Sequence, residues 1–507
     1  MLFSSYVFVF CFLPVVLTGF AVLARLSGRA GAAPWLVAAS FVFYGWWNPA
    51  FVPLLLGSIA FNYALARLIG RAGARPRVQS TLVALGIGCD LAALVYYKYL
   101  ASILAFLRLH GWSGVTLDSP ALPLGISFFT FTQIGFLLDT RNGTVEERGF
   151  SSYLLFVTFF PHLIAGPVLH HREIMPQFAA PETYRISGEN ILIGLAIFAI
   201  GLAKKVLADQ LSGVAAPGFS SADRLALLPA WQAALGYSMQ LYFDFSGYSD
   251  MAIGTARLFN IRFPANFNSP YKARSVIEYW QRWHMTLTRY LSLYLYNPIA
   301  LHIARSRAAR GVPPGRQRSV RGFAATVLVP TAITMTLAGV WHGSGLTFLV
   351  FGLLHAAYLS VNHAWRTFRP AAWKPSRSRA GACRSVALTY GCVLVGAVVF
   401  RAETLADAGA VLSGMLGLHG VVPPASAQER VLTVVRDWTL IALAAAIAFG
   451  APNTQQIMRD FAPVLSPVAG RGWAWRPNLG WALAFGCLGA LGLLGIGGSA
   501  EFLYFQF

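Results

Sequence analysis

The sequence has few charged residues and none of the local signatures of soluble enzymes. Charged side chains make up 11% of the 507 residues and hydrophobic residues 56%. A soluble domain carries roughly 25% charged residues, so this composition excludes a soluble protein. A phosphate-binding loop and the GxSxG and HExxH motifs are all missing, and the five cysteines have neither metal-ligand nor disulfide-framework spacing. Any chemistry must therefore come from polar groups inside a membrane.

Long uncharged runs take the place of those signatures. Crossing a bilayer takes about 20 consecutive apolar residues. Stretches without Asp, Glu, Lys or Arg that reach or approach this length are Ser5–Ala24, Ala30–Ala66, Ser119–Leu138, Gly149–Leu169, Leu225–Phe243, Gly322–Trp365 and Pro477–Ala500. Weaker candidates are Gln79–Tyr97, Asn190–Ala203, Ser385–Phe400 and Trp438–Met458. We expect an all-α polytopic protein with about 10–13 membrane segments, re-entrant and interfacial helices included. Without a long hydrophilic segment or internal repeat, residues 1–507 should form a single transmembrane domain.

The positive charge is concentrated in short segments between the apolar runs. The net charge is +20, and Ile303–Arg321 and Arg366–Arg384 each hold six basic residues and no acid. A third cluster lies between Arg67 and Arg77. Basic residues in short loops stay on the cytoplasmic side, where they also meet anionic lipid headgroups. We therefore expect contacts with membrane lipids and none with nucleic acid.

The Gly322–Trp365 run predicts a helical hairpin with a histidine at its turn. Its 44 residues would make about 66 Å of helix, twice the ~30 Å hydrocarbon core. Arginine clusters flank both ends, so the chain should enter and return, turning at Gly343–Gly345. His342, beside Trp341, then lies away from the cytoplasmic face. A buried neutral imidazole suits a general base. The alternative is a histidine that packs against Trp341 and bonds a neighbouring carbonyl.

A second group of polar residues lies at the end of the apolar run Leu225–Phe243. Asp244, Ser246 and Asp250 follow closely in the segment YFDFSGYSD, and Ser246 and Asp250 are four residues apart, on one side of a helix. The alternative is a capped helix end with solvated carboxylates. Asn268 lies in the following segment, where two prolines and two asparagines indicate an ordered turn.

The segment Ser275–Tyr296 mixes aromatic residues with arginine, which is typical of an amphipathic helix in the membrane interface. Glu278 and Arg282 are spaced to form a helical ion pair. Trp280 and His284 should share another face of the same helix. His284 either points toward the reaction centre or faces the headgroups.

Two further polar features lie upstream. Pro161, Gly166 and Pro167 should break a helix at membrane depth near His162, where such breaks line a cavity or are buried in protein. Asp139 ends another apolar run and is interpreted as marking its interface.

Taken together, these stretches resemble the membrane-bound O-acyltransferase (MBOAT) superfamily, and within it the bacterial branch of the alginate O-acetylation membrane protein and the teichoic acid D-alanyl transfer protein. The resemblance rests on ordered motifs along nearly the whole chain: MLFSS, PLGISFFTFTQIGFLLD, FPHLIAGPVLHHREIMPQF, QLYFDFSGYSDMAIG, RFPANFNSPY, EYWQRWHMTLTRYL, GVWHGSGLTFLVFGLLHA and FLYFQF. One departure is Asn297–His302, where relatives commonly have Ile-Pro-Leu-Gly-Gly.

The resemblance implies an enzyme in which His342 is the essential catalytic residue and His284 the second polar residue facing it. It implies a multi-pass protein of the bacterial inner membrane that acts in exopolysaccharide O-acetylation, as in alginate biosynthesis. The acyl donor, expected to be acetyl-CoA or a carrier thioester, would arrive from the cytoplasm, and the polysaccharide acceptor from the other side. A periplasmic acetyltransferase partner is expected, and no bound cofactor or metal. We assign chamber-lining or donor-contact roles to Asp244, Ser246, Asp250, Trp341, Trp280 and Asn268.

Two other functions stay open. A transporter or flippase would use the buried His and Asp groups as a proton relay. A scaffold of an exopolysaccharide modification complex would tolerate substitutions at His342.

Overall fold

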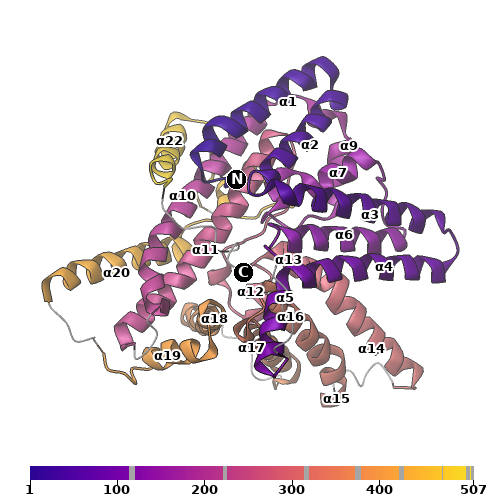
Figure 1. Ribbon diagram of the computed structural model, residues 1–507. Helices are drawn as coiled ribbons and strands as arrows, with labels where there is room; N and C mark the ends of the chain where they lie inside the picture. Colours follow the sequence, from indigo (N-terminus) through magenta and orange to yellow (C-terminus); the bar gives the residue numbers. More distant parts are fainter. Residues whose placement is uncertain are drawn as a thin grey trace. The chain divides into compact units, whose positions relative to one another are not determined.

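The computed structural model describes residues 1–112, 120–220, 225–312, 319–370, 378–421, 427–470, 472–497 and 503, without the side chains of 427–433. Within these ranges every regular element is a helix (Figure 1). The described part of the FLYFQF motif is Leu503, and the rest of the motif lies outside the described residues. The helical content confirms the predicted all-α class.

Seven helices of the described chain are long and apolar enough to cross a membrane. They are Val7–Ser27, Pro49–Arg71, Pro76–Leu109, Gly188–Ser220, Val320–His342, Leu346–Phe368 and Arg379–Arg401. These spans confirm the prediction of a multi-pass membrane protein. They include both arms of the predicted hairpin and three of the runs that the sequence marked as weaker candidates.

The chain divides into two compact units, each assembled from separate stretches. The first contains Met1–Val206, Ser246–Ala265 and Thr454–Gly497, and the second contains Leu207–Phe245, Asn266–Asn453 and Gly498–Phe507. The long helices α10 (Gly188–Ser220) and α11 (Leu227–Leu258) each contribute residues to both units. The single-domain interpretation of 1–507 stays a prediction.

The first unit is built mainly from the amino-terminal helices. They are α1 (Leu13–Ser27), α2 (Arg29–Gly45), α3 (Val52–Arg71), α4 (Pro76–Leu94), α5 (Leu100–Leu109), α6 (Ile126–Arg141), α7 (Phe150–Thr158), α8 (Phe160–Leu163), α9 (His171–Ala179), α21 (Thr454–Ile457) and α22 (Leu479–Leu494). Gly28, with φ of 56°, supplies the left-handed residue that lets the chain reverse between α1 and α2. A Cβ on Gly194 or Gly201 would approach the carbonyl oxygens of Gly254 and Gly247 to 2.7 Å, so these glycines allow α10 and α11 to pack closely.

The second unit holds the remaining helices. They are α12 (Val276–Trp280), α13 (Met285–Leu291), α14 (Asn297–Ala309), α15 (Val320–Phe323), α16 (Val329–His342), α17 (Leu346–Phe368), α18 (Arg379–Arg401), α19 (Leu405–Met415) and α20 (Ala427–Gly450). Short π-helical turns extend several helices of the chain, at Val7–Phe12, Val95–Tyr99, Ser292–Tyr296 and Ala324–Leu328. The core of this unit is aromatic and aliphatic, with Tyr237, Val398 and Val411 fully buried.

The Gly149–Leu169 run does not form one continuous helix. Helix α7 ends at Thr158, Phe159 takes a non-helical conformation (φ −52°, ψ 111°), and α8 is a single turn. His162 is buried inside this interruption. The predicted break is therefore confirmed, because the non-helical Phe159 and the prolines of this segment stop the helix within buried protein.

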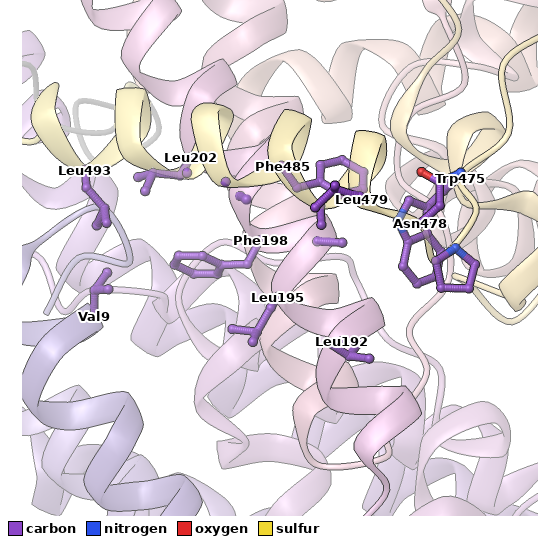
Figure 2. A pocket seen from close by; sticks show the side chains of 16 residues that line it. Val9, Leu192, Leu195, Phe198, Leu202, Trp475, Asn478, Leu479, Phe485 and Leu493 are labelled. Carbon is purple, nitrogen blue, oxygen red and sulfur yellow. The ribbon is translucent and has the colours of Figure 1, made fainter.

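An apolar cavity of about 710 Å³ lies between α10 and α22 in the first unit (Figure 2). Leu192, Leu195 and Phe198 of α10 face Leu479 and Phe485 from α22 across it. Its lining contains no ionisable side chain, so it offers no group for acid–base chemistry.

Candidate functional site

The hairpin predicted from run lengths is present, with the turn at the expected glycines. Helix α16 ends at His342 and α17 begins at Leu346. A Cβ on Gly339 would lie 2.4 Å from the carbonyl oxygen of Phe348, and one on Gly352 would lie 2.5 Å from that of Met335. The two helices are therefore in close backbone contact just beside the turn, which fixes the position of His342.

His342 is buried among aromatic rings at the end of α16. It is 8% exposed. Its ring centroid lies 4.9 Å from that of Trp341, 5.3 Å from that of Phe400 and 6.2 Å from that of Phe351. Rings at these distances enclose the imidazole on several sides and exclude most water from it.

The segment around His284 is not the single amphipathic helix that the sequence predicts. Helix α12 ends at Trp280, and His284 takes a left-handed conformation (φ 42°) before α13 begins. The prediction that Trp280 and His284 share one helical face is therefore wrong. The predicted Glu278–Arg282 ion pair is confirmed, at 2.7 Å.

The helix is interrupted because its backbone bonds to the preceding turn instead. The Asn268 N–H donates to the Arg282 carbonyl oxygen, and the Met285 N–H donates to that of Asn266, both at 2.9 Å. These two bonds hold the chain between Arg282 and Met285 against the turn, so that His284 projects from an irregular loop with its ring 1% exposed.

Asn266 fixes the tautomer of His284. Its side-chain oxygen Oδ1 lies 2.9 Å from His284 Nδ1 and accepts hydrogen bonds from the hydroxyl of Thr286 (2.9 Å) and its backbone N–H (3.5 Å). Because the backbone N–H can only donate, Oδ1 is the acceptor, and Nδ1 of His284 carries the proton. Burial lowers the pKa of the His284 imidazole to about 3. The ring is therefore neutral and has its lone pair on Nε2.

His355 has the opposite tautomer. Trp280 Nε1–H donates to His355 Nδ1 at 3.2 Å, so the neutral ring carries its proton on Nε2. A Cβ on Gly396 of α18 would lie 2.6 Å from His355 Nε2, so this glycine makes room for the ring. On Nε2, His284 therefore has a lone pair that can accept a hydrogen bond, whereas His355 has a proton that it can donate.

All three histidines line one cavity in the second unit. The lining is formed by Leu241, Phe245, Tyr271, Tyr279, Trp280, Trp283, His284, His342, Phe351, His355, Val393, Ala397 and Phe400. Its volume is about 40 Å³, little more than the ~30 Å³ share of one water molecule in the liquid. The structure therefore brings together His342, His284 and Trp280, as the resemblance implies, in a small chamber with aromatic walls.

A second cavity of about 350 Å³ borders the same tryptophan. Trp280 lines both cavities. The larger one carries hydroxyl and amide groups, including Thr288, Ser292 and Thr331. Asn297, the first residue of the segment that departs from relatives, also lines it.

The remaining predicted residues do not line the three-histidine cavity. Trp341 packs edge-on against His342. The Asp244 carboxylate accepts the backbone N–H of Leu503 at 3.1 Å. Asn268 bonds through Oδ1 to the side chain of Asn453, also in the second unit.

Ser246 and Asp250 belong to the first unit, where Asp250 is 3% exposed. Its carboxylate pairs with Lys204 (2.5 Å) and accepts hydrogen bonds from the side chains of Thr454 and Gln455. The alternative interpretation, in which these carboxylates are solvated, is therefore wrong for both Asp244 and Asp250. The structure gives Asp250 a role in pairing charge within its own unit.

Sequence reasoning missed two members of the site. Asn266 is fully buried and orients His284, but in sequence it differs little from Asn268. His355 lies within an apolar run, where packing against neighbouring side chains is the simpler interpretation. Its position thirteen residues after His342 in a returning helix is the only sequence signal that could have found it.

Comparison with known proteins identifies the family of the chain. Residues 125–312 match the model of the MBOAT, membrane-bound O-acyltransferase family. The peptidoglycan O-acetyltransferase of Helicobacter pylori is 38% identical over 83% of this chain and 81% of its own length. The chain belongs to the membrane-bound O-acyltransferase family. It is therefore an acyltransferase with several membrane crossings.

Other relatives of this O-acyltransferase have related names. A probable alginate O-acetylase AlgI of Pseudomonas putida is 36% identical over 82% of this chain and 80% of its own length. The teichoic acid D-alanyltransferase of Bacillus subtilis is 24% identical over 60% of the chain and 76% of its own length. The similarity to O-acetyltransferases of polysaccharide and peptidoglycan thus extends well beyond the region that the family model matches.

Proposed function

We propose that this O-acyltransferase, in a bacterial inner membrane, passes an acetyl group from a cytoplasmic thioester across the bilayer for O-acetylation of an extracytoplasmic polysaccharide. The observation that carries the proposal is the chamber lined by His342, His284 and His355. Three imidazole rings around one small cavity supply both hydrogen-bond donors and acceptors where charged side chains would be costly.

The proposed reaction uses each ring according to its protonation. His342 takes the proton of the acceptor hydroxyl as the hydroxyl oxygen attacks the thioester carbonyl. The carbon–sulfur bond then breaks, the acyl group stays on the acceptor oxygen, and the thiolate leaves with the proton from His342. His284, whose Nε2 also holds a lone pair, is suited to accept the hydrogen bond of the hydroxyl while the acceptor enters, before that single proton is directed at His342.

His355, rather than His284, is suited to stabilise the developing oxyanion. The only N–H of the neutral His284 ring is directed at Asn266. His355 carries its proton on Nε2, because Nδ1 accepts from Trp280. A fixed N–H donor in a low-water site stabilises an oxyanion without reorganisation.

The size of the chamber supports a small acyl group. A volume of about 40 Å³ does not hold a long hydrocarbon chain in this arrangement of side chains. The cavity of about 350 Å³ that Trp280 also lines carries hydroxyl and amide groups and is suited to the amide-containing arm of acetyl-CoA or of a carrier thioester. The acyl end of the donor would then pass Trp280 to reach the histidines.

The acceptor is proposed from relatives. Proteins similar to this chain are named for peptidoglycan and for alginate, which are both polysaccharides outside the cytoplasm. We propose that a separate periplasmic acetyltransferase receives the acetyl group and places it on sugar hydroxyls, so that the polymer is reached directly or through this partner.

The test is acetyl transfer by the protein purified in detergent or reconstituted in vesicles, with radiolabelled acetyl-CoA as donor and an oligosaccharide or the partner enzyme as acceptor. Wild type should release coenzyme A and label the acceptor, and His342→Ala should do neither. The matched control is His419→Ala, which removes an exposed histidine of the same unit and should behave like wild type. A folded His342→Ala protein with wild-type transfer would overturn the proposal, as would transport of substrate without thioester cleavage.

A further inference from the structure

Three potential metal ligands meet in the first unit. The side chains of Asp139, His170 and His171 each offer one ligand atom, and the three atoms lie within 4.8 Å of one another. Nε2 of His171 is 2.9 Å and Nε2 of His170 is 3.1 Å from the same carboxylate oxygen, Oδ2 of Asp139. From its sequence alone Asp139 is interpreted only as an interface marker, and neither histidine is assigned a role.

Two helix ends hold the cluster in place. Asp139 lies in the last turn of α6, and His170 and His171 are the N-cap and first residue of α9. The loop that follows α6 is bonded to both helix ends, because Thr144 donates its N–H and hydroxyl to the Asp139 carbonyl (3.0 and 3.1 Å), and its own carbonyl accepts from Arg172 Nε at 3.1 Å. The ring of Phe136 packs edge-on against His171 at 5.8 Å. The ligand atoms are therefore positioned by backbone and packing as well as by each other.

We propose that Asp139, His170 and His171 bind one divalent transition-metal ion, with Zn²⁺ the best match to their chemistry. Two imidazole nitrogens and one carboxylate oxygen form a three-ligand set that zinc uses with a water in the fourth position. In a tetrahedron with ~2.0–2.1 Å bonds, neighbouring ligand atoms are about 3.3 Å apart. The two nitrogen–oxygen distances of 2.9 and 3.1 Å lie within a few tenths of an ångström of this value, and the two nitrogens, which lie within 4.8 Å of one another, would approach each other around the ion.

The protonation of the ligands is compatible with binding. A neutral imidazole can place its lone pair on Nε2, as metal binding requires. His170 Nδ1 accepts a long 3.3 Å bond from the Arg172 N–H, and this bond would be given up when His170 changes tautomer. His170 is also partly exposed, which gives an ion access from solvent.

Such an ion would act as a clamp between the end of α6 and the start of α9. It replaces two hydrogen bonds to one oxygen by three bonds to one cation, in a loop next to the broken helix that contains His162. The inference does not depend on the acyl-transfer chemistry, and its test uses readouts other than activity.

The experiment uses the full-length protein purified in detergent with an affinity tag that contains no histidine, because a histidine tag binds zinc. The metal-free protein is equilibrated with Zn²⁺, and the amount of bound zinc per chain is measured by elemental mass spectrometry. A parallel titration with Co²⁺ follows the visible absorption of the bound ion. We expect about one ion per chain, the absorption of a nitrogen–oxygen site, and a higher melting temperature with Zn²⁺.

Asp139→Asn separates a metal site from a hydrogen-bonded cluster. The asparagine oxygen can still accept hydrogen bonds from both histidines, but it lacks the charged carboxylate ligand. The variant should bind Zn²⁺ at least tenfold more weakly and lose the zinc-dependent rise in melting temperature, whereas His419→Ala should retain both. Wild type that takes up no stoichiometric zinc overturns the proposal without any variant, and so does equal affinity of Asp139→Asn and wild type.

Discussion

The two units each contain a buried polar cluster, and the clusters are built in opposite ways. In the first unit, Asp250 is paired with Lys204 and bonded to Thr454 and Gln455, so its charge is compensated where it lies. In the second, three histidines surround a cavity and contact mainly aromatic rings. A buried ion pair whose atoms make additional hydrogen bonds is suited to a structural role. Neutral imidazoles beside a cavity are suited to exchange protons. A low number of charges, rather than a high one, thus marks the cluster that we propose to be reactive.

The largest effect should come from His342→Ala. Removing a general base lowers the rate constant by about 10²–10⁴-fold, and the apolar surroundings of His342 should keep the melting temperature near that of wild type. Steady-state transfer kinetics together with a thermal-shift assay in detergent measure both. A parallel fall in activity and melting temperature would mean that His342 supports the fold instead.

Asp250→Asn should show the reverse pattern. Removing one partner of a buried ion pair leaves Lys204 uncompensated and costs about 3–5 kcal/mol. The melting temperature and yield should fall, while the activity of each remaining folded molecule stays close to wild type. Activity normalised to folded protein checks this. Loss of turnover at unchanged stability would assign Asp250 to the chemistry and remove the contrast between the clusters.

Asn266 should act as a positioning residue with an intermediate effect. Asn266→Ala leaves the His284 Nδ1–H without its acceptor, and a lost buried hydrogen bond of about 1–3 kcal/mol corresponds to roughly a tenfold to hundredfold lower rate.

Asn266→Asp adds a readout that a purely structural role would not move. The new carboxylate favours the imidazolium and raises the pKa of His284 from about 3. The acidic limb of the pH–rate profile should therefore move to higher pH, because activity requires the neutral ring. An unchanged pH profile in an active variant would contradict the role of His284.

The smallest effect should come from Trp280→Phe. Phenylalanine retains the aromatic wall of both cavities but removes the N–H that fixes the His355 tautomer. We expect a decrease in rate constant of about threefold to tenfold, equivalent to one hydrogen bond of ~1 kcal/mol, with little change in donor KM. A larger rise in KM than fall in rate constant would instead assign Trp280 to donor binding.

Local rules predicted the features that depend on neighbouring residues. Run length, arginine placement and glycines predicted the hairpin whose first helix ends at His342. The four-residue spacing predicted the Glu278–Arg282 ion pair. The interruption at His284 could not be predicted, because its cause is bonding to Asn266 and Asn268, residues that pattern and propensity do not connect to it. The partner of Asp250 was likewise hidden, because Lys204 is 46 residues and Thr454 204 residues away in the chain.

The left-handed backbone of His284 affects how this residue should be probed. At a φ of 42°, most side chains with a Cβ are strained by roughly 1–2 kcal/mol, and glycine and asparagine tolerate the conformation best. Because histidine also has a Cβ, alanine would remove the imidazole and retain this strain, whereas glycine would relieve it. Asparagine tolerates the conformation and preserves a polar group, so a comparison of His284→Asn with wild type would report on the ring itself.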